Sequence, residues 1–175
     1  HLLIKAFERF EKHFNSELKL VLCGADEVVI SSFAKNIIDL GMVSEEKKLN
    51  LLTHATAIIN PSVNESYSRL IFEGFMLKKP AIVHADCLST ATTIDDAGGA
   101  GWKFANIKEL ILLLSDLDTM THDELNEKGE LAYQYSLQFG DWDKSMERYE
   151  KELKDMVEKK HIAKPPILKE FIPLS

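Results

Sequence analysis

Two glutamates, Glu65 and Glu73, stand eight positions apart within residues 60–83, which read NPSVNESYSRLIFEGFMLKKPAIV. The residue types predict a strand that ends at Asn60, a loop that carries Glu65, and a helix that opens near residues 66–68. The N–H groups in the first turn of a helix lack partners within the helix and attract anions. Carboxylates accept hydrogen bonds from sugar hydroxyls. The segment therefore predicts a phosphate site beside two carboxylates that can grip a polyhydroxylated ligand.

A simpler interpretation of the same glutamates stays open at this point. Glu65 could complement the helix dipole as a first-turn acid, and Glu73 could pair with Arg69 one turn earlier. Arginine before glutamate is, however, the weaker orientation for such a pair. The helix is also rich in apolar residues, which leaves it little exposed surface: Leu70, Ile71, Phe72, Phe75, Met76 and Leu77. An acid within so apolar a helix favours a binding role for Glu73.

Short apolar stretches alternate with helical patterns along the whole chain. Strands are expected at 18–23, 37–43, 56–60, 81–85 and 102–104. Helices are expected at 1–13, 26–36, 66–78 and 106–117, from Ser44 and Thr121 onward, and briefly within 86–97. The alternation predicts an α/β fold, a Rossmann-like parallel sheet of about five or six strands with helices on both faces. Ligands bind at the carboxyl ends of such strands, so the loops after Gly24, Gly41, Asn60 and Ala85 are expected to form the functional edge.

Composition narrows the classes of function. The 175 residues suit one domain, and 45% apolar with 28% charged residues is an ordinary globular balance. A net charge of −7 argues against nucleic-acid binding, and no apolar run reaches the length of a transmembrane segment. Two cysteines give neither a disulfide framework nor a metal pattern and fit a reducing cytoplasm. His84, Asp86 and Cys87 lack a second ligand cluster, so no metal site is expected.

A family resemblance covers nearly the whole chain. The stretch INPSVNESYSRLIFEGFMLKKPAIVHAD resembles the signature of the group-1 glycosyltransferases, the GT4-type retaining family with the GT-B fold. Upstream, DLGMVSEEKKLNLLTHATAIINPS is similar to the family's preceding segment. Downstream, GGAGWKFANIKELILLL and FGDWDKSMERYEKEL are similar to its glycine-rich turn and its closing helix. Several segments in the right order make the match specific for the family but not for the substrate.

The resemblance implies that the chain is the C-terminal, donor-binding half of such an enzyme. It implies that Glu65 is catalytic, approaching the hydroxyls and the reacting centre of the donor sugar, and that Glu73 holds the ribose hydroxyls of the nucleotide. The other donor-binding residues that it implies are Ser66, Tyr67, Ser68 and Arg69 at the sugar and diphosphate, and Gly24, Gly41, Met42 and Val43 at the nucleobase.

The sequence also departs from the family's pattern. Ser-Tyr-Ser at 66–68 replaces the usual Gly-Phe-Gly, and Arg69 stands where an aliphatic residue is common and is expected to point outward. HADCLSTATTIDDAGG replaces the usual Pro-Glu after the next strand, which puts contacts from that loop in doubt. The family's acceptor domain and its basic diphosphate clamp would precede His1. The resemblance therefore implies that these 175 residues are inactive alone.

The leading hypothesis is retaining transfer of a sugar from a nucleoside diphosphate, UDP or GDP, to an acceptor that is a saccharide, a lipid or a protein. Residues 1–175 would form a single donor-binding domain, with a closing helix at about 141–161 and an extended tail at 162–175. No cofactor or metal is required, and the enzyme would be cytoplasmic, with any membrane contact made by its missing N-terminal domain. Two alternatives stay open: a nucleotide-sugar epimerase of GT-B architecture, and a non-catalytic nucleotide-binding or interaction module.

Overall fold

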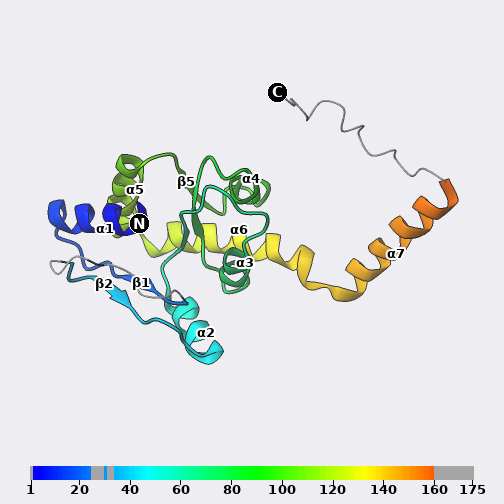
Figure 1. The fold of residues 1–175 in the computed structure, drawn as a ribbon, viewed down its shortest axis with the longest axis horizontal. Coiled ribbons are helices and arrows are strands. Elements are labelled where there is room, and N and C mark those ends of the chain that lie inside the picture. Colours follow the sequence, from blue (N-terminus) through cyan, green and yellow to red (C-terminus); the bar gives the residue numbers. More distant parts are fainter. Residues whose placement is uncertain (1, 25–29, 31–33, 160–175) are drawn as a thin grey trace, which may run out of the picture. The chain divides into compact units, whose positions relative to one another are not determined.

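The computed structural model describes residues 2–24, 30 and 34–159 (Figure 1). The chain divides into two compact units, His1–Gln138 and Phe139–Ser175, and each is described by itself. The helices and strands follow one another as α1 (Leu2–His13), β1 (Leu20–Leu22), β2 (Ile37–Asp39), α2 (Glu45–His54), β3 (Ile58–Asn60), α3 (Arg69–Met76), β4 (Ala81–His84), α4 (Leu88–Asp96), β5 (Gly101–Phe104), α5 (Ile107–Thr119), α6 (His122–Gly140) and α7 (Trp142–Lys159).

Every strand pairing among the described residues is parallel, which confirms the predicted α/β fold with parallel strands and flanking helices. The strands form two ladders, β1-β2 and β3-β4-β5, where the sequence predicted one sheet of about five or six strands. Side-chain packing joins the two groups in place of hydrogen bonds. Leu20 of β1 and Ile37 of β2 belong to the same core cluster as Ile82 of β4 and Phe104 of β5.

Strand β4 lies at the centre of the first unit, and all four of its residues are buried. Successive side chains of a strand point to opposite faces. Ile82 packs into a core with α1 and α5, whereas Ala81 and Val83 pack into a second core with α2, α3, α4 and α6. This double burial explains why β4 is apolar throughout, as strands of parallel sheets usually are.

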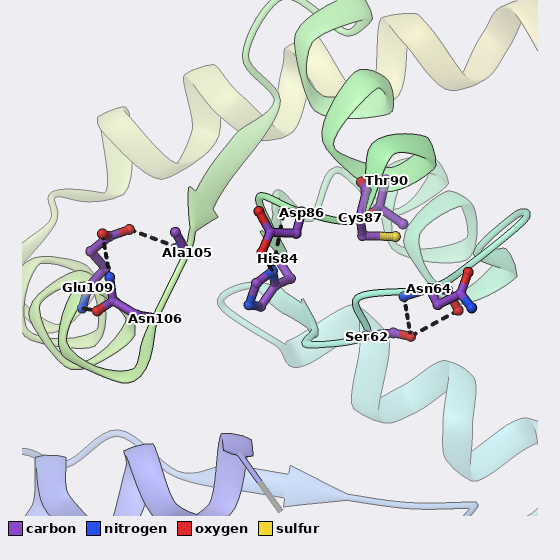
Figure 2. Close-up of polar contacts among 9 residues, drawn as sticks. All are labelled: Ser62, Asn64, His84, Asp86, Cys87, Thr90, Ala105, Asn106 and Glu109. Atoms are coloured by element: carbon purple, nitrogen blue, oxygen red, sulfur yellow. Dashed lines mark hydrogen bonds and ion pairs between the residues drawn. The ribbon is translucent and has the colours of Figure 1, made fainter.

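Two helices of the first unit begin at the capping signals that the sequence predicted. The Asn106 side chain accepts hydrogen bonds from the Lys108 and Glu109 amides at the start of α5. Glu109 in turn accepts the Ala105 amide at 2.8 Å (Figure 2). Such reciprocal pairs satisfy the N–H groups that the first turn leaves open. At the start of α6 the Thr121 amide donates to Glu124 at 2.8 Å, which is the same kind of capping bond.

Several predicted boundaries differ from the structure, three of them at the candidate site. The strand predicted at 37–43 ends at Asp39, because the Asp39 carboxylate accepts the Gly41 amide at 3.0 Å and Gly41 has a positive φ of 56°. The helix predicted to open near residues 66–68 begins at Arg69. The strand predicted at 56–60 begins at Ile58. Most of the helix predicted at 26–36 lies outside the described residues.

The second unit contains α7, which occupies most of the predicted closing helix at 141–161. Asp141 precedes it and accepts the Lys144 amide at 3.0 Å, as expected of a capping residue. The tail predicted at 162–175 lies outside the described residues, and a single donor-binding domain over the whole chain stays a prediction. Within 2–24, 30 and 34–159, no helix is both long and apolar enough to cross a membrane.

Three glycines allow neighbouring elements of the first unit to pack closely. A Cβ atom at Gly74 of α3 would lie 2.5 Å from Cγ1 of Ile58 on β3. One at Gly129 of α6 would collide with the carbonyl oxygen of Lys78, just after α3. One at Gly101 of β5 would collide with the backbone of β4. Helix α3 is therefore confined between β3 and α6.

We expect Gly101→Ala to lower the free energy of unfolding by about 3 kcal/mol, the upper end of the usual cost of overpacking. The added methyl group would meet the Ala81 carbonyl oxygen, which the ladder between β4 and β5 holds in place. Urea denaturation measures the change. Gly140→Ala is the control, since a Cβ there meets open space at the end of a helix. Equal losses in the two variants would contradict this account.

Candidate functional site

Asn60, the last residue of β3, organises the loop that leads to α3. Its side chain is buried; Oδ1 accepts the Ser62 amide at 3.0 Å, and Nδ2 donates to Oγ of Ser68 at 2.9 Å. The same Nδ2 lies 3.5 Å from Oε1 of Glu65. Buried amides require hydrogen-bond partners, and here the partners come from the beginning, the middle and the end of one loop. The loop is therefore folded around the carboxyl end of β3.

The start of α4 holds the backbone of Glu65. The Ser89 hydroxyl donates to the Glu65 carbonyl oxygen at 2.6 Å. Cys87, which is buried at the N-terminal end of α4, receives a hydrogen bond from the Glu65 backbone. Burial opposes ionisation of the Cys87 thiol, but hydrogen bonds from Thr90, Ser89 and Glu65 outweigh it and lower the pKa of the thiol below its usual value. The Glu65 backbone is thus fixed by α4, and its side chain is left beside β3.

The N-terminus of α3 is not capped by a side chain. Ser68 occupies the capping position, but its hydroxyl accepts the Asn60 amide group and makes no hydrogen bond to the first turn of α3. Its carbonyl oxygen accepts the Phe72 amide at 3.4 Å, which closes that turn. The Arg69 and Leu70 side chains are exposed, as expected for Arg69. The first-turn N–H groups of such a helix can receive an anion.

Glu73 lies in the second turn of α3 and faces α2. Its Oε1 accepts a hydrogen bond from Nζ of Lys48 at 3.2 Å, and the same Nζ lies 2.8 Å from Oε2 of Glu45. Hydrogen bonds to Glu45 and then to Glu73 raise the pKa of Lys48 above its usual value. The simpler interpretation of the spacing, a pair between Glu73 and Arg69, is therefore wrong about the partner of Glu73, which is a lysine from another helix.

The residues that the family resemblance implies for the nucleobase gather where β1 and β2 end. The Gly24 amide donates to the Gly41 carbonyl oxygen at 2.8 Å, and both glycines have positive φ angles, 81° and 56°. Met42 follows in the turn and is 80% exposed, and Val43 is half-buried. Helix α2 then begins after Ser44, whose hydroxyl accepts the Lys47 amide, as the sequence predicted.

The structure connects these groups through α2 and does not collect them at one point. Leu52 of α2 packs in the same core cluster as Ile71 and Phe75 of α3, and the contact between Lys48 and Glu73 lies beside this packing. Glu65 contacts β3 and α4 instead. The two glutamates therefore make separate contacts, Glu65 with β3 and α4 and Glu73 with α2.

The remaining predicted residues lie in the loop before α3. Ser66 is exposed, whereas the Tyr67 ring stacks on Phe72 of α3 with ring centroids 4.7 Å apart. Burial against this surface raises the pKa of Tyr67. Tyr67 thus lies against α3, although 56% of the residue remains exposed.

Sequence reasoning missed Lys48, Ser89 and the role of Asn60 in folding the loop. One signal for Lys48 was present: it stands four residues before Leu52, so the two share a helix face. No comparable signal marked Ser89, because its partner lies 24 residues away.

The contacts of His84, at the end of β4, hold the local fold together. Its Nδ1 accepts the Asp86 amide at 3.2 Å (Figure 2). Its ring packs edge-on against Phe104. Within the part of the chain that the structure describes, no group of three or more His, Cys, Asp or Glu side chains is placed to hold a metal ion.

No protein-family model and no curated protein matches this chain. Solved structures do match, among them the N-terminal domain of a trehalose-6-phosphate phosphatase from Candida albicans. The match has a TM-score of 0.65 at 13% identity and covers 78% of this chain and 35% of the other. At this identity the likeness concerns the fold alone, and the chain spans about a third of its structural neighbour's length.

We expect Asn60→Ala to lower the free energy of unfolding by about 2 kcal/mol, because it leaves the buried Ser68 hydroxyl without its donor. Urea denaturation again measures the change. Asn64→Ala serves as the matched control, since Asn64 is an exposed residue of the same loop. If Asn64→Ala costs as much as Asn60→Ala, the loop is not organised by β3.

Proposed function

We propose that the chain binds a nucleoside-diphosphate sugar and forms the donor half of a retaining glycosyltransferase. The observation that carries this proposal is a row of polar groups that follow β2 and β3 in the chain. Glu65 meets Asn60 at the end of β3, the uncapped start of α3 follows, Glu73 of α3 meets Lys48 of α2, and α2 begins shortly after the turn of Gly41. We assign these groups, in that order, to the sugar, the diphosphate, the ribose and the base of the ligand.

The sugar and diphosphate would lie at the first half of the row. Glu65 would accept hydrogen bonds from sugar hydroxyls, with its backbone held by Ser89. The first-turn N–H groups of α3 would receive the diphosphate, and the exposed Arg69 adds a positive charge there. Because the chain carries a net charge of −7, phosphate binding must depend on such local groups.

The nucleoside would lie at the second half. Glu73 would accept the paired ribose hydroxyls through its carboxylate, as the family resemblance implies for this position. The turns of Gly24 and Gly41 offer backbone groups close to the base, and the exposed Met42 offers an apolar surface to its ring.

The chemistry proposed for this site is electrostatic. The bond between the anomeric carbon and a diphosphate oxygen breaks, while an acceptor hydroxyl attacks from the same face and passes its proton to the departing diphosphate. The α3 N-terminus and Arg69 would stabilise the charge that develops on the diphosphate. Glu65, beside the sugar, would stabilise the oxocarbenium-like centre. No metal ion is needed for these roles.

The proposal also gives the chain a partner. The acceptor site and a basic clamp for the diphosphate would come from a preceding N-terminal domain, so these 175 residues would bind the donor without transferring its sugar. A panel of UDP, GDP, ADP and their glucose conjugates, scored by thermal shift, identifies the nucleotide, since ligands of the native state raise its melting temperature.

We expect the two glutamates to differ in a calorimetric titration of the chain. Glu73→Gln should weaken binding of the free nucleoside diphosphate by about tenfold to a hundredfold, because a hydrogen bond to a charged acceptor is lost. Glu65→Gln should leave binding of the free nucleotide unchanged and weaken only the binding of the sugar conjugate. Glu130→Gln is the control, since Glu130 forms an exposed ion pair with Lys78 away from the site.

Two results would overturn the proposal. If both Glu65→Gln and Glu73→Gln match Glu130→Gln with every ligand, the glutamates are surface residues and the chain is not a donor-binding module. Release of an epimerised sugar nucleotide in the absence of any acceptor would instead assign the site to an epimerase.

A further inference from the structure

Lys48 has the least exposed side chain among the lysines of the first unit for which the structure shows an ion pair. It reaches Glu73 from a different helix, 25 residues earlier in the chain, and the side chains of Lys48 and Glu73 are 28% and 37% exposed. The pair of Lys78 and Glu130, by comparison, has side chains that are 56% and 48% exposed. Exposed pairs hold their side chains loosely and contribute little to stability. The Lys48 contact is less exposed than the pair of Lys78 and Glu130 and joins two helices, so it is better placed to restrain a carboxylate.

The position of Lys48 is itself fixed. The Ser44 cap starts α2, and the Lys48 amide donates to the Ser44 carbonyl oxygen at 2.9 Å, in the first turn. One turn later Leu52 is buried against α3. The adjacent Gly74 permits α3 to approach β3 closely at the position after Glu73. Both partners of the ion pair therefore stand on packed helices.

Glu45 gives the lysine a second anchor. Nζ of Lys48 lies 2.8 Å from Oε2 of Glu45 and 3.2 Å from Oε1 of Glu73. A lysine held between two carboxylates has its charge neutralised locally, so it is a poor candidate for binding a phosphate group. The contact with Glu73 uses one carboxylate oxygen, which leaves Oε2 as the oxygen that can face a ligand.

We propose that Lys48 is a positioning residue that holds Oε1 of Glu73 and so directs Oε2 toward the ribose diol of a bound nucleotide. This inference rests on the donor-binding function proposed above. Holding a carboxylate in its binding orientation removes the entropy cost of ordering it on binding, which corresponds to roughly three- to tenfold in affinity. The gain applies only to ligands that carry the diol, so Lys48 is also a determinant of ribose specificity.

The test compares two forms of one ligand in titrations of the 175-residue chain. The probes are the nucleoside diphosphate that binds best among UDP, GDP and ADP, and its 2′,3′-dideoxy form. Lys48→Met is expected to lower the affinity for the ribonucleotide by roughly three- to tenfold and to leave the affinity for the dideoxy form unchanged. Lys48→Arg keeps a cation and should restore most of the preference. Lys78→Met is the matched control and should change neither affinity.

The possible outcomes distinguish a failure of the Lys48 inference from a failure of the proposed donor-binding function. If the unaltered chain binds no nucleotide, or binds both forms equally, the donor-binding proposal fails. The positioning role of Lys48 then fails with it. If the unaltered chain and Glu73→Gln behave as expected but Lys48→Met keeps the full ribose preference, only the positioning role is overturned. An equal loss for both forms would mark Lys48 as a structural residue, as would a failure of Lys48→Arg to restore the preference. A Lys48→Gln variant supplies the comparison if Lys48→Met does not fold.

Discussion

Ala81, Ile82 and Val83 have no exposed surface, and their side chains alternate between two separate hydrophobic cores. A strand in this position must be covered on both faces, and the helices that cover it must cross from one parallel strand to the next. These crossings bring the carboxyl ends of β3, β4 and β5 to one edge. The Glu65 loop and the start of α4, which follow β3 and β4, therefore lie at this edge.

Polar groups at this edge are buried only where they have partners. Asn60 and Ser68 bond to each other, and the Thr90 hydroxyl reaches the Cys87 carbonyl oxygen at 3.3 Å. An unpaired buried polar group would cost more than such a bond contributes, so each partner restricts the loop conformations that the site can adopt. The same bonds that stabilise the fold at this edge therefore limit the movement of the backbone around Glu65.

The sequence predicted those features that depend on neighbours along the chain. The alternation of elements and the caps at Ser44, Asn106 and Thr121 were found because capping bonds join residues within one turn. The start of α3 was misplaced because the Ser68 hydroxyl accepts a hydrogen bond from the Asn60 side chain and does not cap the helix. The partner of Glu73 was missed for a related reason: periodicity within a helix carries no information about which side chains a neighbouring helix presents.

The glycine contacts around α3 bear on how such a site can change during evolution. With Gly74 against Ile58 on one side and Gly129 against Lys78 on the other, the helix has no room to slide or rotate when neighbouring residues are exchanged. Exposed residues of the Glu65 loop, such as Asn64 and Ser66, take no part in these glycine contacts, so their exchange would leave Glu73 in place. Under the function proposed above, the part of the site assigned to the sugar could diverge while the part assigned to the nucleoside is retained, so new donor sugars would be accessible to this scaffold more readily than new nucleotides.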